Sequence, residues 1–167
     1  MVRRVPLTGG EKESLKAALE RHRDVVLWKI EGLDDEQLRR PLVPSGTSLL
    51  GLVKHLAATE YWWFCETFGR PVELLPSIDP DDGESDLRIR PDESTADIVA
   101  YYERARAAAN AALDEIDLEA VGRSWQGEPV TMRWVAIHMV EEDARHAGHL
   151  DILRELVDGA TGDHDRS

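Results

Sequence analysis

The chain has 167 residues, of which 42% are hydrophobic, and its formal net charge is −13 at pH 7. This length suits one domain with a single core, which we place at residues 1–158, followed by a polar C-terminal tail at 159–167. The acidity argues against nucleic acids and anionic membrane surfaces as partners, because phosphate binding needs clustered Lys and Arg side chains.

The N-terminal segment and the cysteine content indicate the compartment. The segment MVRRVPLTGG has two arginines but no apolar region after them, so it does not resemble a secretory signal. No apolar run is long enough to span a bilayer. The single cysteine, Cys65, cannot form an internal disulfide, which fits a reducing compartment. We therefore expect a cytoplasmic protein in which Cys65 is a buried hydrophobic residue and not a nucleophile.

The first half of the chain predicts two helices. Thr8 and Glu11 have capping-box spacing, which predicts a helix that runs to about Glu31 and stops at Gly32. A linker with two prolines and a glycine follows. The segment from Ser48 to Gly69 is apolar on most sides, so it predicts a second helix that is the most buried of all.

A long acidic connection, from Arg70 to Ser94, follows the second helix. Its prolines and the turn signal DPDDG exclude a helix interior. A connection of this length is usually a functional loop or a crossover that lets neighbouring helices run parallel. Further helices are predicted from Ser94 to Ile116 and from Thr131 to Asp158. Since no stretch shows strand alternation, we predict an all-α four-helix bundle with a long crossover loop between its second and third helices.

The last predicted helix carries ionisable side chains where apolar ones are expected. His138, His146 and His149 each fall within roughly 40° of Glu142 around the helix, because each helical residue advances by about 100°. Leu153 shares this stripe, so the four polar residues lie on the side that should face the core. Such conflicts between local pattern and packing tend to mark functional sites.

A divalent metal would make this arrangement tolerable. Glu142 and His146 are four residues apart, so both side chains lie over one spot of the helix, as two ligands of one ion do. His55, on the apolar second helix, is the natural third ligand, although taken alone it is a structural histidine. Imidazole and carboxylate ligands suit Zn, Ni or Fe(II). The alternative is a hydrogen-bonded network that includes Arg145. His149 could orient a ligand or coordinate.

The remaining charged side chains of these helices are expected at the surface. Lys54 and Glu60 have room to reach solvent from the second helix. On the last helix, a solvated face opposite the histidines is predicted to comprise Glu141, Asp143, Asp151, Arg154 and Glu155. His164, in the polar tail, is expected to face solvent.

Two segments, SLLGLVKHLAATEYWW (48–63) and MRWVAIHMVEEDARHAGHLDILRE (132–155), resemble the DinB-like superfamily of four-helix metalloproteins. The resemblance is closest to its mycothiol-dependent branch, which includes maleylpyruvate isomerase. That family takes one metal ligand from the second helix and two, spaced by four, from the last helix. The matching residues here are His55, Glu142 and His146. Many relatives have histidine in place of Glu142, and some have glutamine in place of His149.

The resemblance implies a metal-dependent thiol S-transferase or isomerase that uses mycothiol or a similar small thiol on a small electrophile, as a homodimer. We expect zinc, with nickel or iron as alternatives. His149 and Arg145 are the candidate catalytic residues, and Trp62 and Trp134 the candidate cofactor-binding residues, with core packing as the alternative for each tryptophan. A metal-dependent hydrolase and a non-catalytic metal- or ligand-binding stress protein remain alternative functions.

Overall fold

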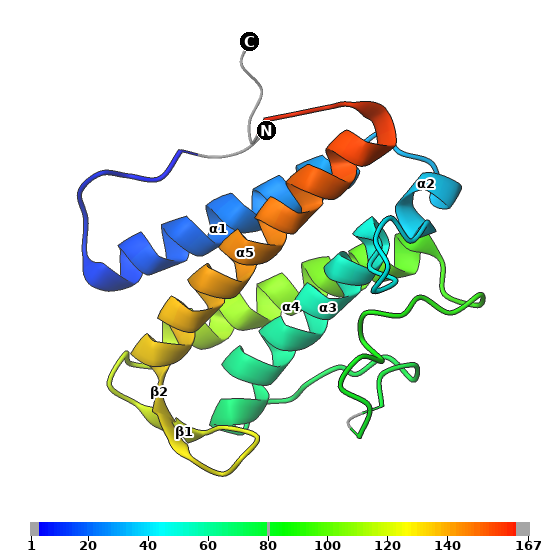
Figure 1. Ribbon diagram of the computed structural model, residues 1–167. Coiled ribbons are helices and arrows are strands. Elements are labelled where there is room, and N and C mark those ends of the chain that lie inside the picture. The colour runs from blue at the N-terminus through cyan, green and yellow to red at the C-terminus, as the bar shows by residue number, and fades with distance from the viewer. Residues whose placement is uncertain (1–3, 80, 163–167) are drawn as a thin grey trace.

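The computed structural model describes residues 4–79 and 81–162, so His164 and the end of the predicted tail lie outside the described residues. The described chain forms an all-α four-helix bundle, which confirms the predicted fold class (Figure 1). The elements in chain order are α1 (Glu11–Ile30), α2 (Asp35–Arg39), α3 (Leu49–Phe64), a short 3₁₀ turn (Glu66–Phe68), α4 (Thr95–Glu115), β1 (Val121–Arg123), β2 (Pro129–Thr131) and α5 (Met132–Asp158).

The first and last long helices run in the same direction. Arg133, at the start of α5, donates to Glu11 at the start of α1 over 2.7 Å, and Lys29 near the end of α1 pairs with Asp151 of α5 over 2.5 Å. Helices α3 and α4 also run parallel to each other, in the direction opposite to α1 and α5 (Figure 1). This topology requires a connection that returns along the whole length of α3.

The segment between the 3₁₀ turn and α4 is that connection. A 16-residue helix is about 24 Å long at 1.5 Å per residue, which explains why the crossover loop must be long. The loop packs tightly against α3 at Gly51, where a Cβ atom would lie 2.3 Å from the carbonyl oxygen of Leu87. The predicted crossover is therefore confirmed, and it lies directly on the helix that carries His55 (Figure 1).

Helix starts follow the predicted capping residues with one exception. Ser94 accepts a hydrogen bond from the backbone N–H of Asp97 over 3.0 Å and so caps α4. The capping box expected at Thr8 is wrong, since α1 begins two residues later than that box would place it. Its N-cap is Gly10, whose backbone N–H donates to the carboxylate of Glu13 over 3.1 Å.

A small β-hairpin that the sequence did not predict precedes α5. Strands β1 and β2 pair antiparallel, with Gly122 opposite Val130. Three-residue strands are too short to give a readable alternation. Gly122 allows the hairpin to pack against the 3₁₀ turn that follows α3, because a Cβ atom there would lie 2.3 Å from the carbonyl oxygen of Thr67. The hairpin turn carries Trp125 to the end of α3 that lies beyond His55.

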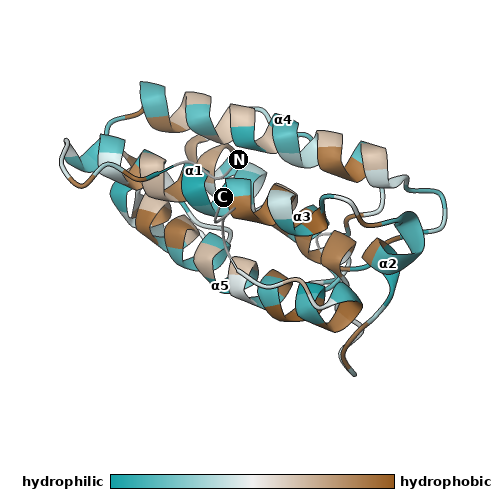
Figure 2. Ribbon diagram, turned by 90° about the horizontal axis from the view of Figure 1, so that it is seen from above, coloured by the Kyte–Doolittle hydropathy of each residue, from teal (hydrophilic) through white to brown (hydrophobic). Residues whose placement is uncertain are grey.

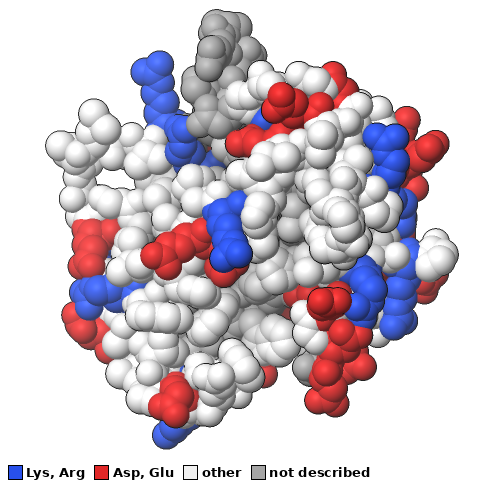
Figure 3. Space-filling model, in the orientation of Figure 1, with Lys and Arg blue, Asp and Glu red and all other residues white. Residues whose placement is uncertain are grey.

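Apolar side chains from all four long helices form one core. Figure 2 shows hydrophobic and hydrophilic residues alternating around the helices, as amphipathic helices require. Cys65 is 1% exposed, and burial raises the pKa of its thiol, which confirms that it is a buried hydrophobic residue. On the face shown in Figure 3, basic side chains lie among acidic ones. Among the described residues, no helix is both long and apolar enough to cross a membrane.

Two residues predicted at the surface are buried in an ionic cluster instead. Glu60 of α3 and Asp143 of α5 are fully buried, and both face the fully buried guanidinium of Arg23 from α1. Arg23 donates to Glu60 over 2.5 Å, and its Nε lies 3.8 Å from Asp143. The three partners come from three different helices. The pattern of each helix taken alone therefore predicts a surface position for its carboxylate.

Lys54 was also predicted to reach solvent and is also fully buried. Its ammonium donates to the carbonyl oxygen of Arg88 over 2.8 Å and pairs with Glu93 over 2.9 Å. Both partners lie in the crossover loop, which leads to α4. Lys54 therefore fastens the loop to α3 next to His55.

Candidate metal centre

The structure brings together the three residues predicted as metal ligands. His55 comes from α3, and Glu142 and His146 come from successive turns of α5. One potential ligand atom from each lies within 4.8 Å of the others. On the predicted stripe of α5, Glu142 and His146 join this cluster, whereas His138 packs against Trp63 of α3.

The cluster is tight but open to solvent. Glu142 Oε2 lies 3.1 Å from His146 Nε2, and the imidazole rings of His55 and His146 meet edge to face with centroids 4.9 Å apart. The side chains of His55, Glu142 and His146 are 19%, 26% and 14% exposed. A small molecule can therefore approach these groups, which distinguishes the cluster from a closed structural site.

Asp86 orients His55, a role that no local sequence pattern indicates. Its Oδ2 lies 2.7 Å from Nδ1 of His55, so a proton on Nδ1 is donated to the carboxylate and Nε2 keeps its lone pair. The other oxygen, Oδ1, is buried and has no hydrogen-bond partner among the residues that the structure describes. A histidine that binds a metal commonly has such a carboxylate behind it. The acidic crossover loop contains several equivalent aspartates, and only the path of the loop selects this one.

His146 keeps a neutral imidazole at neutral pH. Burial, followed by the nearby charge of His55, lowers the pKa of His146 to about 4. A neutral ring has one nitrogen lone pair available for a cation. His149 lies beside it on the exposed side of α5, with the two Nδ1 atoms 3.3 Å apart. His149 can therefore exchange protons with solvent while it touches the cluster.

The other candidate residues lie at the margin of the site or outside it. Arg145 is exposed on α5, and its positive charge is a minor cause of the lowered pKa of His146. Trp134 is 48% exposed and stacks on His138 with ring centroids 4.8 Å apart. Trp63 contacts both rings. Trp134 is thus not a core residue, and it does not line the cavity next to His55.

An apolar cavity of about 310 Å³ adjoins the cluster on the His55 side. The end of α3, the hairpin turn and the crossover loop form its walls. Its lining residues are His55, Thr59, Trp62, Trp63, Thr67, Gly83, Asp86 and Trp125. The predicted ligand-binding residue Trp62 therefore lies where a molecule next to His55 would contact it.

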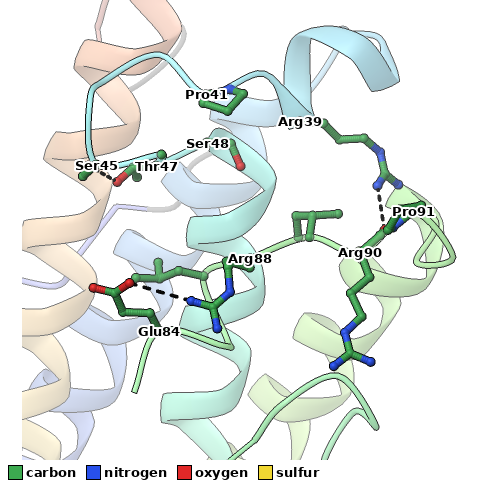
Figure 4. A pocket seen from close by; sticks show the side chains of 12 residues that line it. Arg39, Pro41, Ser45, Thr47, Ser48, Glu84, Arg88, Arg90 and Pro91 are labelled. Atoms are coloured by element: carbon green, nitrogen blue, oxygen red, sulfur yellow. Dashed lines mark hydrogen bonds and ion pairs between the residues drawn. The ribbon is translucent and has the colours of Figure 1, made fainter. Parts of the chain in front are cut away.

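A larger hollow of about 580 Å³ lies at the other end of α3. Figure 4 shows Arg39 and Arg88 at its rim, where Arg39 reaches the carbonyl oxygen of Arg90 and Arg88 reaches Glu84. These guanidiniums are already engaged by protein groups, and none of the three cluster residues lines this hollow. We therefore assign the chemistry to the smaller cavity beside His55.

The residue types fit a divalent ion. Two imidazoles and one carboxylate are typical ligands of Zn²⁺ and of other first-row metals. Three protein ligands leave further coordination positions for a small molecule. The Oδ1 atom of Asp86, which is buried and has no partner within the described part of the chain, is consistent with this assignment, because a cation on the far side of His55 would offset the cost of burying that charge.

Fold and site together define a class: a four-helix bundle with a His–Glu–His cluster between two helices and an apolar cavity beside it. The Mycothiol-S-transferase family matches residues 14–159, so the chain belongs to this family, within the DinB-like superfamily. Membership supports a transferase of the mycothiol type. No curated protein matches the chain.

A solved structure has the same fold. The crystal structure described as the conserved protein of a locus from Enterococcus faecalis superposes with a TM-score of 0.67. The similarity covers 92% of this chain and 100% of that chain, at 16% sequence identity. At this identity the likeness establishes the bundle architecture alone.

Proposed function

We propose that the protein is a divalent-metal-dependent S-transferase that joins mycothiol or a similar small thiol to a small electrophile. His55, Glu142 and His146 would hold the ion, for which Zn²⁺ is the first choice. The observation that carries this proposal is the approach of their ligand atoms to within 4.8 Å beside an apolar cavity.

The chain does not supply the nucleophilic thiol itself. Its single cysteine, Cys65, is 1% exposed and has a raised thiol pKa, so it offers no thiolate to a substrate. The sulfur must therefore come from a small molecule. A divalent ion, when bound, lowers the pKa of a thiol that coordinates it, so that the thiol is deprotonated at neutral pH.

The surrounding residues have distinct tasks in this proposal. Asp86 holds the ring of His55 in one orientation. The exposed imidazole of His149 takes the thiol proton and releases it to solvent. The sulfur electron pair forms the new S–C bond, and the leaving group departs with the electron pair of the bond that breaks. Arg145 stays a prediction, and from its exposed position it would act on a group outside the cavity.

The test is conjugation of mycothiol to monochlorobimane, followed by fluorescence, with metal-free protein and with added Zn²⁺. We expect the conjugate to form faster than in the uncatalysed reaction only when protein, thiol and metal are all present. Glu142→Gln removes a charged ligand at almost constant shape, so it should lower kcat/KM by at least about 100-fold and reduce bound zinc. Glu141→Gln, at the exposed neighbouring position, is the matched control and should behave like the native protein.

Other outcomes assign other functions. Conversion of the electrophile without any thiol would indicate a metal-dependent hydrolase. Stoichiometric metal without turnover over a range of thiols and electrophiles would indicate a binding protein. Zinc binding that is unaffected by both Glu142→Gln and His55→Ala would contradict the proposed ligand set.

A further inference from the structure

The charge of the cavity beside His55 limits the molecules that it can accept. Among the described residues that line it there is no lysine and no arginine. Its one charged lining side chain is Asp86, whose carboxylate already contacts His55. An anionic group placed here would therefore meet a negative charge and lose its hydration without a cationic partner.

A bound divalent ion would not make the surroundings of the cavity attractive to anions. Glu142 brings one negative charge to the cluster and Asp86 brings another behind His55. Together they neutralise the two positive charges of the ion, before any thiolate adds a further negative charge. The overall charge of −13 also makes the electrostatic potential around the protein negative at long range.

The walls favour apolar and aromatic groups. Trp62 and Trp63 are half-buried along α3, and Trp125 extends from the hairpin turn with 75% of its surface exposed. Aromatic faces of this kind bind flat apolar groups with favourable stacking geometry. A volume of about 310 Å³ is at the small end for ligand sites, which fits a molecule of one or two rings.

We propose that this cavity selects an uncharged, apolar and preferably aromatic electrophile, and that it rejects carboxylates and phosphates. The inference rests on the proposed transferase function and narrows its substrate class. It separates this chain from the isomerase of the branch that it resembles, because maleylpyruvate is a dicarboxylate and no lysine or arginine is among the described residues that line this cavity.

Binding of a matched pair of ligands tests the inference without any turnover. 2-Naphthamide and 2-naphthoate have the same ring and nearly the same shape, and they differ in charge at neutral pH. Isothermal titration calorimetry with metal-free and zinc-loaded protein should show the amide binding about 10- to 100-fold more tightly than the carboxylate in both forms. Tighter or equal binding of the carboxylate in either form would overturn the proposal, as would a failure of both ligands to bind.

Two variants locate the effect in the cavity. Thr59→Lys places a cation in the lining and should raise naphthoate affinity at least about tenfold, while Thr8→Lys, on the exposed N-terminal segment, should leave it unchanged. Trp125→Ala, at a turn where this side chain is 75% exposed, should weaken naphthamide binding about tenfold. If Thr59→Lys fails to recruit naphthoate, the cavity is not where the discrimination arises and the inference is wrong.

The outcomes separate this inference from the proposed function. Selective binding of the amide without thiol-dependent turnover would refute the transferase and leave the neutral cavity standing. Efficient conjugation of an anionic electrophile would refute the neutral cavity and leave the transferase standing.

Discussion

Replacement of Arg23 by methionine should destabilise the protein far more than loss of a surface arginine. Arg23 is fully buried, and its guanidinium donates to Glu60 over 2.5 Å and to Glu20 and Asn110 over 2.9 Å each. Methionine fills similar space but leaves the carboxylates of Glu60 and Asp143 buried without their cation. Breaking a buried ion pair in this way costs about 3–5 kcal/mol.

The loss should depend on pH. Burial raises the pKa of Glu60 and, together with the charge of Glu60, raises the pKa of Asp143. For an acid whose pKa is higher in the folded state, protonation favours folding, so stability falls as pH rises through the folded-state pKa. Removal of Arg23 raises both pKa values further. The deficit of Arg23→Met should therefore be largest near pH 7.5 and should shrink towards pH 5.

Urea unfolding followed by circular dichroism at pH 7.5 and pH 5.5 measures this difference directly. At the higher pH we expect the free energy of unfolding to fall by about 4 kcal/mol and the midpoint of thermal unfolding to fall by about 8–16 °C. Arg104→Met removes an arginine from an exposed pair with Glu73 and should be indistinguishable from the native protein. A deficit under about 1 kcal/mol, or one that is equal at both pH values, would refute the reasoning.

Two further predictions concern the crossover loop. Asp86→Asn should weaken zinc binding about 10- to 100-fold, because it removes the negative charge behind His55. Competition with a chelator measures the affinity for zinc. Asp81→Asn, at an exposed position of the same loop, should have no effect. Gly51→Ala places a Cβ atom 2.3 Å from the carbonyl oxygen of Leu87, so it should displace the loop and cost about 1–3 kcal/mol. Gly148→Ala, a helical glycine with no atom within 4 Å of the added Cβ, should instead gain up to about 1 kcal/mol; equal behaviour of the two variants in urea unfolding would contradict the packing argument.

The sequence by itself predicted the bundle and the three residues of the cluster. Helical periodicity and capping residues such as Ser94 predicted the long helices, because these signals act within a few residues. The spacing of Glu142 and His146 predicted their approach for the same reason, since four residues make about one helical turn. His55 is a polar residue among the apolar residues of α3, which made it the natural third ligand. The structure places it next to Glu142 and His146.

Only the tertiary structure decided which charged residues are buried and which aspartate supports His55. The sequence pattern predicts surface positions for Lys54, Glu60 and Asp143 because each of them pairs with a residue of another element. Lys54 and its partner Arg88, for example, are 34 residues apart along the chain. Asp86 lies 31 residues from His55, at a distance over which no local pattern operates. Burial of a charge depends on the chain segment that packs against it, and that packing is fixed by the path of the crossover loop and the pairing of the helices.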